Sequence, residues 1–256
     1  MASSLDEIIA LLKSSDGQER RRGFSEAEQY LDSEEVDAAG APDLVEALLP
    51  AMSHSNPMFV QGALGLLIAL VEVMGEDLTP YVAGVWAPLV ERLGDAKVAN
   101  RERAVDLAVA LGSLVVPPAQ ALERLKPAWE HKNWRARESS LHHFGRLLAQ
   151  HDSPAALGFS LKSMLPLVVK LLEDREPPVR EAAFVAVEQM HRHLGPPAAR
   201  LACMRNTTSS TLSLPHARCT ACRDALCRTA PHAHMRMRRR VYPPPRRLRA
   251  LLFLIW

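Results

Sequence analysis

The feature that most constrains the fold is a pattern that recurs about every 40 residues. Five segments share it: an apolar helix end, a short polar turn, a basic or amide residue, and a second helix with apolar residues three and four apart. They read LLKSSDGQERRRGFSEAEQYL from Leu11, LLPAMSHSNPMFVQGALGLLIALV from Leu48, LVERLGDAKVANRERAVDLAVALG from Leu89, LKPAWEHKNWRARESSLHHFGRLLA from Leu125 and LVVKLLEDREPPVREAAFVAVEQMH from Leu167. The pattern predicts an array of similar two-helix units.

The basic or amide residue serves as a register mark. It falls at Arg22, Gln61, Arg101, Arg137 and Arg180, with successive spacings of 39, 40, 36 and 43 residues. A period near 40 with two helices per unit is typical of HEAT and armadillo repeats. We therefore predict an all-α fold, an α-α superhelix of about five recognisable HEAT-like repeats, with every intra-repeat turn on the same edge.

The second helices support this prediction. Apolar residues spaced three or four apart form one stripe, which buries against neighbouring repeats. The two clearest stripes are Val105, Ala108, Leu111 and Val115, and Ala183, Val187, Met190 and Leu194. The composition agrees, because the chain is 48% hydrophobic but only 5% aromatic, which suits stacked helices better than pleated sheets.

Charge divides the chain into two parts. Residues 1–200 contain 20 Lys or Arg and 28 Asp or Glu, whereas residues 201–256 contain 11 Arg and a single acid, Asp224. We therefore expect a helical-repeat domain over residues 1–200 and a basic tail, disordered or not evolved as protein, over residues 201–256. All four cysteines lie in the tail, so no disulfide is expected in the repeats.

The basic residues of the repeats gather at the intra-repeat turns, which predicts a positive ridge on an acidic body. We expect Lys97, Lys132, Arg135 and Arg175 to be exposed there and to bind an acidic partner. A structural alternative stands beside this one, because a turn Asp and an Arg early in the second helix often form a ladder between neighbouring repeats. We assign that structural ladder to Arg22, Gln61, Arg101, Arg137 and Arg180.

Two aromatic residues also belong to the row of turns. Trp134 lies between Lys132 and Arg135, and Phe59 follows Met58. Either ring could be core filler, but a turn is an unusual place for a core residue, and Trp beside Arg is typical of interface anchors. We expect Trp134 to anchor an interface. For Phe59 both interpretations stay open.

Several stretches resemble a known family. FVQGALGLLIAL, VERLGDAKVANRERA, AWEHKNWRARES and LLEDREPPVREAA are similar to the N-terminal TOG domain of the CLASP (cytoplasmic linker-associated) proteins, in a plant or algal style. The resemblance runs from about residue 5 to 195, and W-x-H-K-x-W-R-x-R-E from Trp129 to Glu138 is its most specific part. It implies six HEAT repeats whose intra-repeat loops bind αβ-tubulin and stabilise microtubules.

The resemblance carries tubulin contacts onto the turns of this chain. It places them in Gln18–Arg22, Asn56–Gln61, Ala96–Arg101, Lys132–Arg137 and Arg175–Arg180. The partner-binding residues expected are Arg20, Arg21, Asn56, Met58, Phe59, Lys97, Lys132, Trp134, Arg135 and Arg175. Two departures stand out: Gly17 and Gln18 replace the aromatic residue that many tubulin-binding TOG domains have in the first turn, and nothing over about 200–235 matches a sixth repeat.

The alternative function is a general HEAT-repeat scaffold, of the karyopherin or phosphatase-scaffold kind, that binds partners on its concave helix face. No glycine-rich phosphate loop or G-x-S-x-G motif is present, so we expect neither an enzyme nor a cofactor. No signal peptide is visible and no apolar run approaches the roughly 20 residues of a membrane span. We expect a cytoplasmic, microtubule-associated monomer with no membrane and no specific nucleic-acid partner.

The tail admits three interpretations. His216, Cys219, Cys222 and Cys227 contain only half of a zinc site, because a second correctly spaced cysteine pair is missing. MRMRRR and PPPRRLR could form a basic arm for polyanions. The third interpretation, which we favour, is translated non-coding or frameshifted sequence that replaces the last repeat.

Overall fold

A computed structural model describes residues 4–32, 38–151 and 157–194. In these ranges the chain forms five antiparallel helix pairs and no strand, which confirms the all-α superhelix and the five repeats. The pairs are α1 (Leu5–Lys13) with α2 (Gly17–Asp32), α3 (Ala41–Met52) with α4 (Pro57–Met74), α5 (Trp86–Leu93) with α6 (Val98–Ala110), α7 (Pro118–Trp129) with α8 (Trp134–Gln150), and α9 (Leu161–Leu171) with α10 (Pro177–Leu194).

Short helical turns join the first four pairs along the opposite edge. They are the 3-10 turns η1 (Ala38–Gly40), η2 (Gly75–Leu78) and η3 (Val82–Gly84), and the π-helical turn η4 (Leu111–Val115). Gly75 lies between α4 and η2 with a φ of 54°, a backbone conformation that glycine adopts without steric cost. These connections let each pair stack directly on the one before it.

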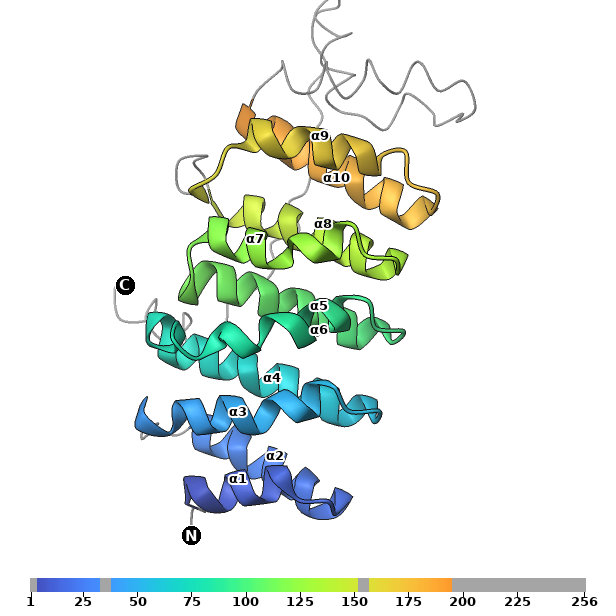
Figure 1. The fold of residues 1–256 in the computed structure, drawn as a ribbon. Coiled ribbons are helices and arrows are strands. Elements are labelled where there is room, and N and C mark those ends of the chain that lie inside the picture. The colour runs from blue at the N-terminus through green and yellow to red at the C-terminus, as the bar shows by residue number, and fades with distance from the viewer. Residues whose placement is uncertain (1–3, 33–37, 152–156, 195–256) are drawn as a thin grey trace, which may run out of the picture.

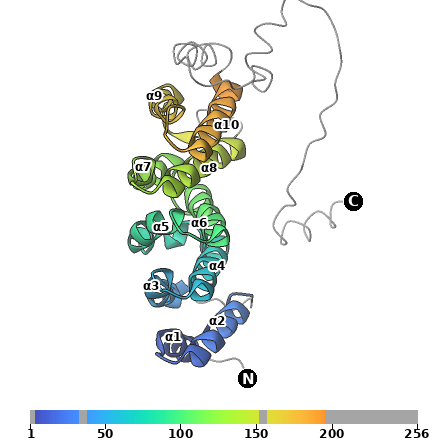
Figure 2. The same cartoon turned by 90° about the vertical axis from the view of Figure 1, so that its right-hand side faces the viewer.

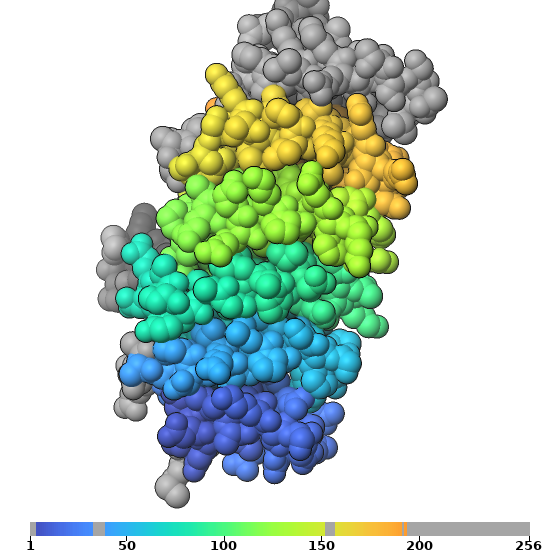
Figure 3. Space-filling model, in the orientation of Figure 1, coloured from blue at the N-terminus to red at the C-terminus, as the bar shows by residue number. Residues whose placement is uncertain are grey.

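The helices form two layers (Figures 1 and 2). The first helix of every pair lies in one layer and the second helix in the other. All five intra-repeat turns lie along one edge of the stack, on the right in Figure 1. In the space-filling view the pairs form successive tiers without a break between them (Figure 3). A row of turns on a continuous stack is an extended surface that a large partner can cover.

The predicted stripes lie in the core. Val105, Ala108, Leu111 and Val115 are all buried, as are Ala183 and Met190, and Val187 is partly buried against the second apolar cluster. Two apolar clusters continue one another through the stack, the first from Ile8 to Ala136 and the second from Leu122 to Met190. Burying such faces against neighbouring repeats supplies most of the stability of a solenoid.

The expectation that no apolar run approaches the length of a membrane span was wrong. The stretch Pro57–Leu78, which holds α4, is long and apolar enough to cross a membrane by length and hydropathy alone. In the fold α4 instead packs against α2, α3 and α6. Its high hydropathy follows from this central place, since a helix covered on several sides is apolar around much of its circumference.

Candidate partner-binding edge

The five intra-repeat turns are built on one plan. In each turn a side chain accepts a hydrogen bond from the backbone N–H two residues later, and the second helix begins one residue after that amide. The acceptor–donor pairs are Ser14 Oγ and Asp16 at 3.0 Å, His54 Nδ1 and Asn56 at 2.9 Å, Asp95 Oδ1 and Lys97 at 2.8 Å, His131 Nδ1 and Asn133 at 3.1 Å, and Asp174 Oδ1 and Glu176 at 3.0 Å. This bond fixes the turn and the start of the helix.

An arginine closes four of the turns from the other side. It lies six residues after the acceptor and donates its guanidinium back to the acceptor's own carbonyl oxygen. The four bonds are Arg20 to Ser14 at 2.5 Å, Arg101 to Asp95 at 3.0 Å, Arg137 to His131 at 2.7 Å, and Arg180 to Asp174 at 2.9 Å. These carbonyls follow the C-terminal ends of the first helices, where a positive charge is favourable.

The predicted ladder was therefore misplaced in the first two repeats. Arg20, not Arg22, occupies the aligned position in the first turn, and Arg22 instead pairs with Glu26 at 2.5 Å on α2. In the second repeat the position belongs to the buried Val60 rather than Gln61. The repeats therefore align on the first residue of the second helix. The basic or amide residue chosen from the sequence is not a reliable mark for this alignment.

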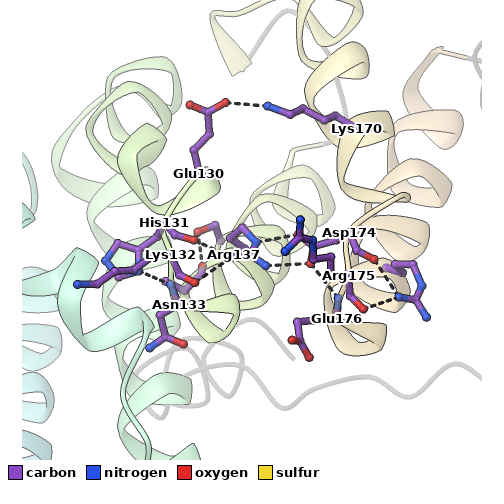
Figure 4. Close-up of polar contacts among 12 residues, drawn as sticks. Glu130, His131, Lys132, Asn133, Arg137, Lys170, Asp174, Arg175 and Glu176 are labelled. Atoms are coloured by element: carbon purple, nitrogen blue, oxygen red, sulfur yellow. Dashed lines mark hydrogen bonds and ion pairs between the residues drawn. The ribbon is translucent and has the colours of Figure 1, made fainter.

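Within the described ranges, Arg137 is the one arginine of these four that also forms an ion pair with the neighbouring repeat. Arg137 donates from Nε and Nη2 to the two carboxylate oxygens of Asp174, each at 2.8 Å (Figure 4). Both side chains are largely buried, at 16% and 9% exposed. Burial alone would raise the pKa of Asp174. The Arg137 hydrogen bonds, the Glu176 amide and the charge of Arg180 outweigh it and hold this pKa below its usual value.

Further bonds tie the third and fourth turns together. Asn133 donates from Nδ2 to the carbonyl oxygen of Gly94 at 2.6 Å while its Oδ1 accepts the Arg135 amide and caps α8. On the first-helix side, Lys170 and Glu130 pair at 3.2 Å across the fourth and fifth repeats. The last three turns thus form a connected row.

The side chains that point outward from this row are fewer than the sequence predicted. Lys97, Lys132 and Arg175 are exposed, and within the described ranges their side chains have no hydrogen bond or ion pair. Arg21 is also exposed, and so is the apolar Met58, at 60%. Val98, which sequence reasoning missed, is 56% exposed at the start of α6. Its position directly after an N-cap residue was the available signal.

Three predicted contact residues have structural roles in the turns. Phe59 is only 4% exposed, stacks on Phe24 with ring centroids 5.8 Å apart, and is covered by the Arg20 guanidinium at 5.0 Å. The prediction that Phe59 binds a partner is therefore corrected to a core role, and Arg20 is engaged by its own turn. Asn56 accepts the Met58 amide at 3.0 Å and caps α4, so it shapes the edge from within.

Trp134 combines the two interpretations given above. It begins α8, is half-buried, and packs against the second apolar cluster. The Arg135 guanidinium lies over its ring, 4.6 Å from the centroid. Such stacking orders the arginine and leaves part of the ring accessible. The aligned residue in the first turn is Gly17, so the aromatic side chain is in the fourth turn rather than the first.

A hollow of about 670 Å³ lies between the fourth and fifth turns. Trp129, Leu167 and Leu171 contribute apolar wall, and Lys132 and Arg175 lie at the turn tips on either side. The two inter-repeat ion pairs, Glu130–Lys170 and Arg137–Asp174, span it (Figure 4). The hollow therefore offers an apolar surface next to unpaired positive charge.

The described part of the chain holds no group of three or more His, Cys, Asp or Glu side chains placed to bind a metal ion. The zinc candidates His216, Cys219, Cys222 and Cys227 lie outside the described residues, as does the region expected for a sixth repeat.

Fold and edge together define a class of protein: an α-solenoid of HEAT-like helix pairs whose turns form one connected edge. The model of the family described as CLASP N terminal matches residues 41–213, about two thirds of the 256 residues. The chain belongs to this family, which confirms the resemblance seen in the sequence.

Curated relatives agree. The chain is 28% identical to the CLIP-associated protein of Arabidopsis thaliana over 200 residues, which cover 75% of this chain and 13% of that protein. It is 32% identical to the protein CLASP-1 of Caenorhabditis briggsae over 150 residues, which cover 56% of this chain and 11% of the relative. The chain thus spans only about an eighth of the length of these relatives.

Solved structures show the same fold. The crystal structure of the MAST/Orbit N-terminal domain superposes with a TM-score of 0.71 at 22% identity, covering 90% of this chain and 99% of that one. A TOG domain of Crescerin, described as regulating microtubules in the primary cilium, gives a TM-score of 0.64 at 21% identity, covering 90% and 91%. The fold is that of a TOG domain.

Proposed function

We propose that this chain is a non-enzymatic TOG-type domain that binds αβ-tubulin or the microtubule lattice through its row of turns, and so stabilises microtubules and regulates their dynamics. The domain comprises residues 1–200, and residues 201–256 form the basic tail. It acts as a monomer on cytoplasmic microtubules.

One observation carries the proposal: the positive charges left unpaired on the edge. Lys132 and Arg175 occupy the same position in adjacent turns, directly after the acceptor residue, and both are exposed. Four arginines of the row, Arg20, Arg101, Arg137 and Arg180, instead donate their guanidinium groups to turn carbonyls. Unpaired cations on an otherwise acidic body favour an acidic partner in one orientation.

Exposed apolar residues on the same edge add area to the proposed contact. Met58 and Val98 project from the second and third repeats, and Trp134 offers part of its ring in the fourth. Interfaces combine such apolar anchors with a charged rim. The described function of the structural relatives and the family membership both support tubulin as this partner.

Co-sedimentation with taxol-stabilised microtubules tests the proposal. We expect the chain to pellet at low salt and Lys132→Glu with Arg175→Glu to weaken binding at least about tenfold, because both substitutions replace attraction by repulsion. The matched control is Arg124→Glu with Lys162→Glu, an equal change of charge at exposed first-helix positions away from the turns. Equal loss in both double variants would point to general attraction and contradict a specific edge.

The alternative scaffold function places binding on the face of the second helices. It predicts that charge reversal at Lys132 and Arg175 is silent while substitution of exposed second-helix residues, such as Arg103→Glu, abolishes binding. The two functions therefore give opposite results with the same two variants, the Lys132, Arg175 double variant and Arg103→Glu.

A further inference from the structure

Two of the five turns use a histidine where the others use a serine or an aspartate. In the second turn His54 Nδ1 accepts the Asn56 amide at 2.9 Å, and in the fourth His131 Nδ1 accepts the Asn133 amide at 3.1 Å. The carboxylates of Asp95 and Asp174 make the same bond in the third and fifth turns. Because Nδ1 accepts, the neutral imidazole in these turns carries its proton on Nε2.

We propose that His54 and His131 make the second and fourth turns of the partner-binding edge sensitive to pH. A protonated imidazole has N–H donors on both nitrogens, so its Nδ1 faces the backbone N–H as a second donor and the turn bond is lost. Histidine is the side chain that ordinarily changes charge between pH 5 and 8. The other three turns accept through the Ser14 hydroxyl and the Asp95 and Asp174 carboxylates, so they contain no imidazole to protonate.

Loss of either turn bond would disturb neighbouring residues that we assign to the partner contact. Asn56 and Asn133, whose amides the imidazoles hold, use their own side chains to cap α4 and α8. Met58 and Arg135 donate to those caps, and Trp134 lies directly beside Asn133. Release of the turn therefore loosens the start of α4 and of α8 together with the side chains presented there.

The charged groups around the two imidazoles differ. Around His131, Glu91 of α5 lies 3.9 Å from Nε2, while Arg137 of α8 binds the His131 carbonyl oxygen. Across the hollow, α9 and the fifth turn contribute Lys170, Glu173, Asp174 and Arg175, and the fourth turn itself contributes Glu130 and Lys132. Glu91 therefore places a negative charge beside the His131 imidazole, and the cations of the hollow place positive charges around it.

His54 has an apolar neighbour instead. Its ring meets Phe59 edge-on, with centroids 5.0 Å apart, and Arg20 of α2 lies over the same Phe59 ring. Within the described ranges no carboxylate is within ion-pair distance of His54. The imidazole of the fourth turn thus has a carboxylate beside its Nε2, whereas the imidazole of the second turn has an aromatic ring beside it.

Nuclear magnetic resonance of the whole, ¹⁵N-labelled chain tests the turn mechanism without any partner. Between pH 8 and 5.5 the amide signals of Asn56 and Asn133 should shift with the titration of the two imidazoles. Those of Lys97 and Glu176 are internal controls, held by carboxylates, and should stay in place. His54→Asn and His131→Asn supply a neutral acceptor of the same turn type and should abolish the shifts. Imidazoles that titrate while both amides stay fixed would overturn the proposal.

The consequence for binding rests on the proposed function and is measured by microtubule co-sedimentation at pH 7.4 and 6.2. The wild-type chain should bind about fivefold more weakly at the lower pH, the factor expected for one lost hydrogen bond. The His54→Asn, His131→Asn double variant should change less than twofold. A double variant as sensitive to pH as the wild type would overturn the link to binding. Failure of both to bind at either pH would contradict the proposed function instead, while the amide shifts still decide the turn mechanism.

Discussion

The first two turns of the edge and the last two are held together by different forces. Between the first and second, Phe24 and Phe59 stack and Arg20 covers the Phe59 ring. Between the fourth and fifth, Arg137 holds Asp174 through two hydrogen bonds of 2.8 Å. Apolar helix faces pack throughout the stack, but at the edge the first two turns are joined by apolar packing and the last two by charge. We therefore expect salt and pH to act mainly on the C-terminal end.

The largest effect is expected at the apolar end. Phe59→Ala removes a buried ring between the first two repeats and should lower the free energy of unfolding by about 3–5 kcal/mol. Urea denaturation measures it, and the loss should be the same at low and high salt. The neighbouring Met58→Ala is the control, since its exposed side chain should contribute less than about 0.5 kcal/mol. Equal losses for the two variants would mean that Phe59 is not the fastening residue.

The charged end gives the next effect. Arg137→Ala leaves Asp174 as a buried carboxylate without its partner, so the free energy of unfolding should fall by about 3 kcal/mol at pH 7. The pKa of Asp174 in the folded chain lies below its usual value. The pair therefore stabilises the fold fully at any pH above that usual value, and this stabilisation is lost as the pH falls through the lowered pKa. Urea denaturation at several pH values should show the difference between variant and wild type shrinking in strong acid. A difference independent of pH would contradict a charge-based fastening.

A buried histidine in the fourth repeat should make the stability of the C-terminal end depend on pH. His143 on α8 is fully buried, and within the described ranges its two ring nitrogens make no hydrogen bond of good geometry. Burial lowers its pKa from 6.5 to about 4; the Ala108 backbone raises it in part, and Arg146 lowers it further. The unfolded chain therefore takes up this proton first. Stability should be full above pH 6.5 and fall by about 3 kcal/mol as the pH drops from 6.5 to 4.

His143→Leu isolates this contribution, because leucine cannot take up a proton. Relative to the wild type, the variant should gain stability as the pH falls from 6.5 to 4, by about 3 kcal/mol over this range. Parallel losses in the two proteins over this range would show that other groups cause the acid sensitivity.

The smallest effect is expected at the outer ion pair of the charged end. Lys170 and Glu130 are 71% and 72% exposed, so Lys170→Gln should change the free energy of unfolding by less than about 0.5 kcal/mol. Thermal unfolding at low and high salt would detect it. A loss comparable to that of Arg137→Ala would show that the outer ion pair joins the last two repeats as strongly as the buried pair does.

The period of the repeats predicted the number of helix pairs and the edge on which the turns lie. It could not fix the register within a turn, because Arg20, Arg21 and Arg22 are equivalent by residue type. Only the first residue of α2 shows that Arg20 occupies the closing position. The burial of Phe59 follows from the same cause, since its aligned residue in the fourth repeat is the buried Ala136.

The roles of the five turn acceptors could have been predicted from the sequence, but we did not predict them. Ser14, His54, Asp95, His131 and Asp174 align once the helix starts are known, and all are acceptors. Contacts between turns were not within reach. The Asn133–Gly94 bond joins residues 39 apart and depends on how closely two repeats pack. That distance is set by many apolar side chains together, so no short motif encodes it.

Hydrogen–deuterium exchange of the whole chain, with and without taxol-stabilised microtubules, tests the central claim most directly. Binding through the edge predicts slower exchange in peptides that cover the five turns, strongest around Lys132 and Arg175, and unchanged exchange across the opposite edge at η2 and η4. Slower exchange confined to the middle of the second helices, with the turns unchanged, would contradict the account and favour the concave scaffold.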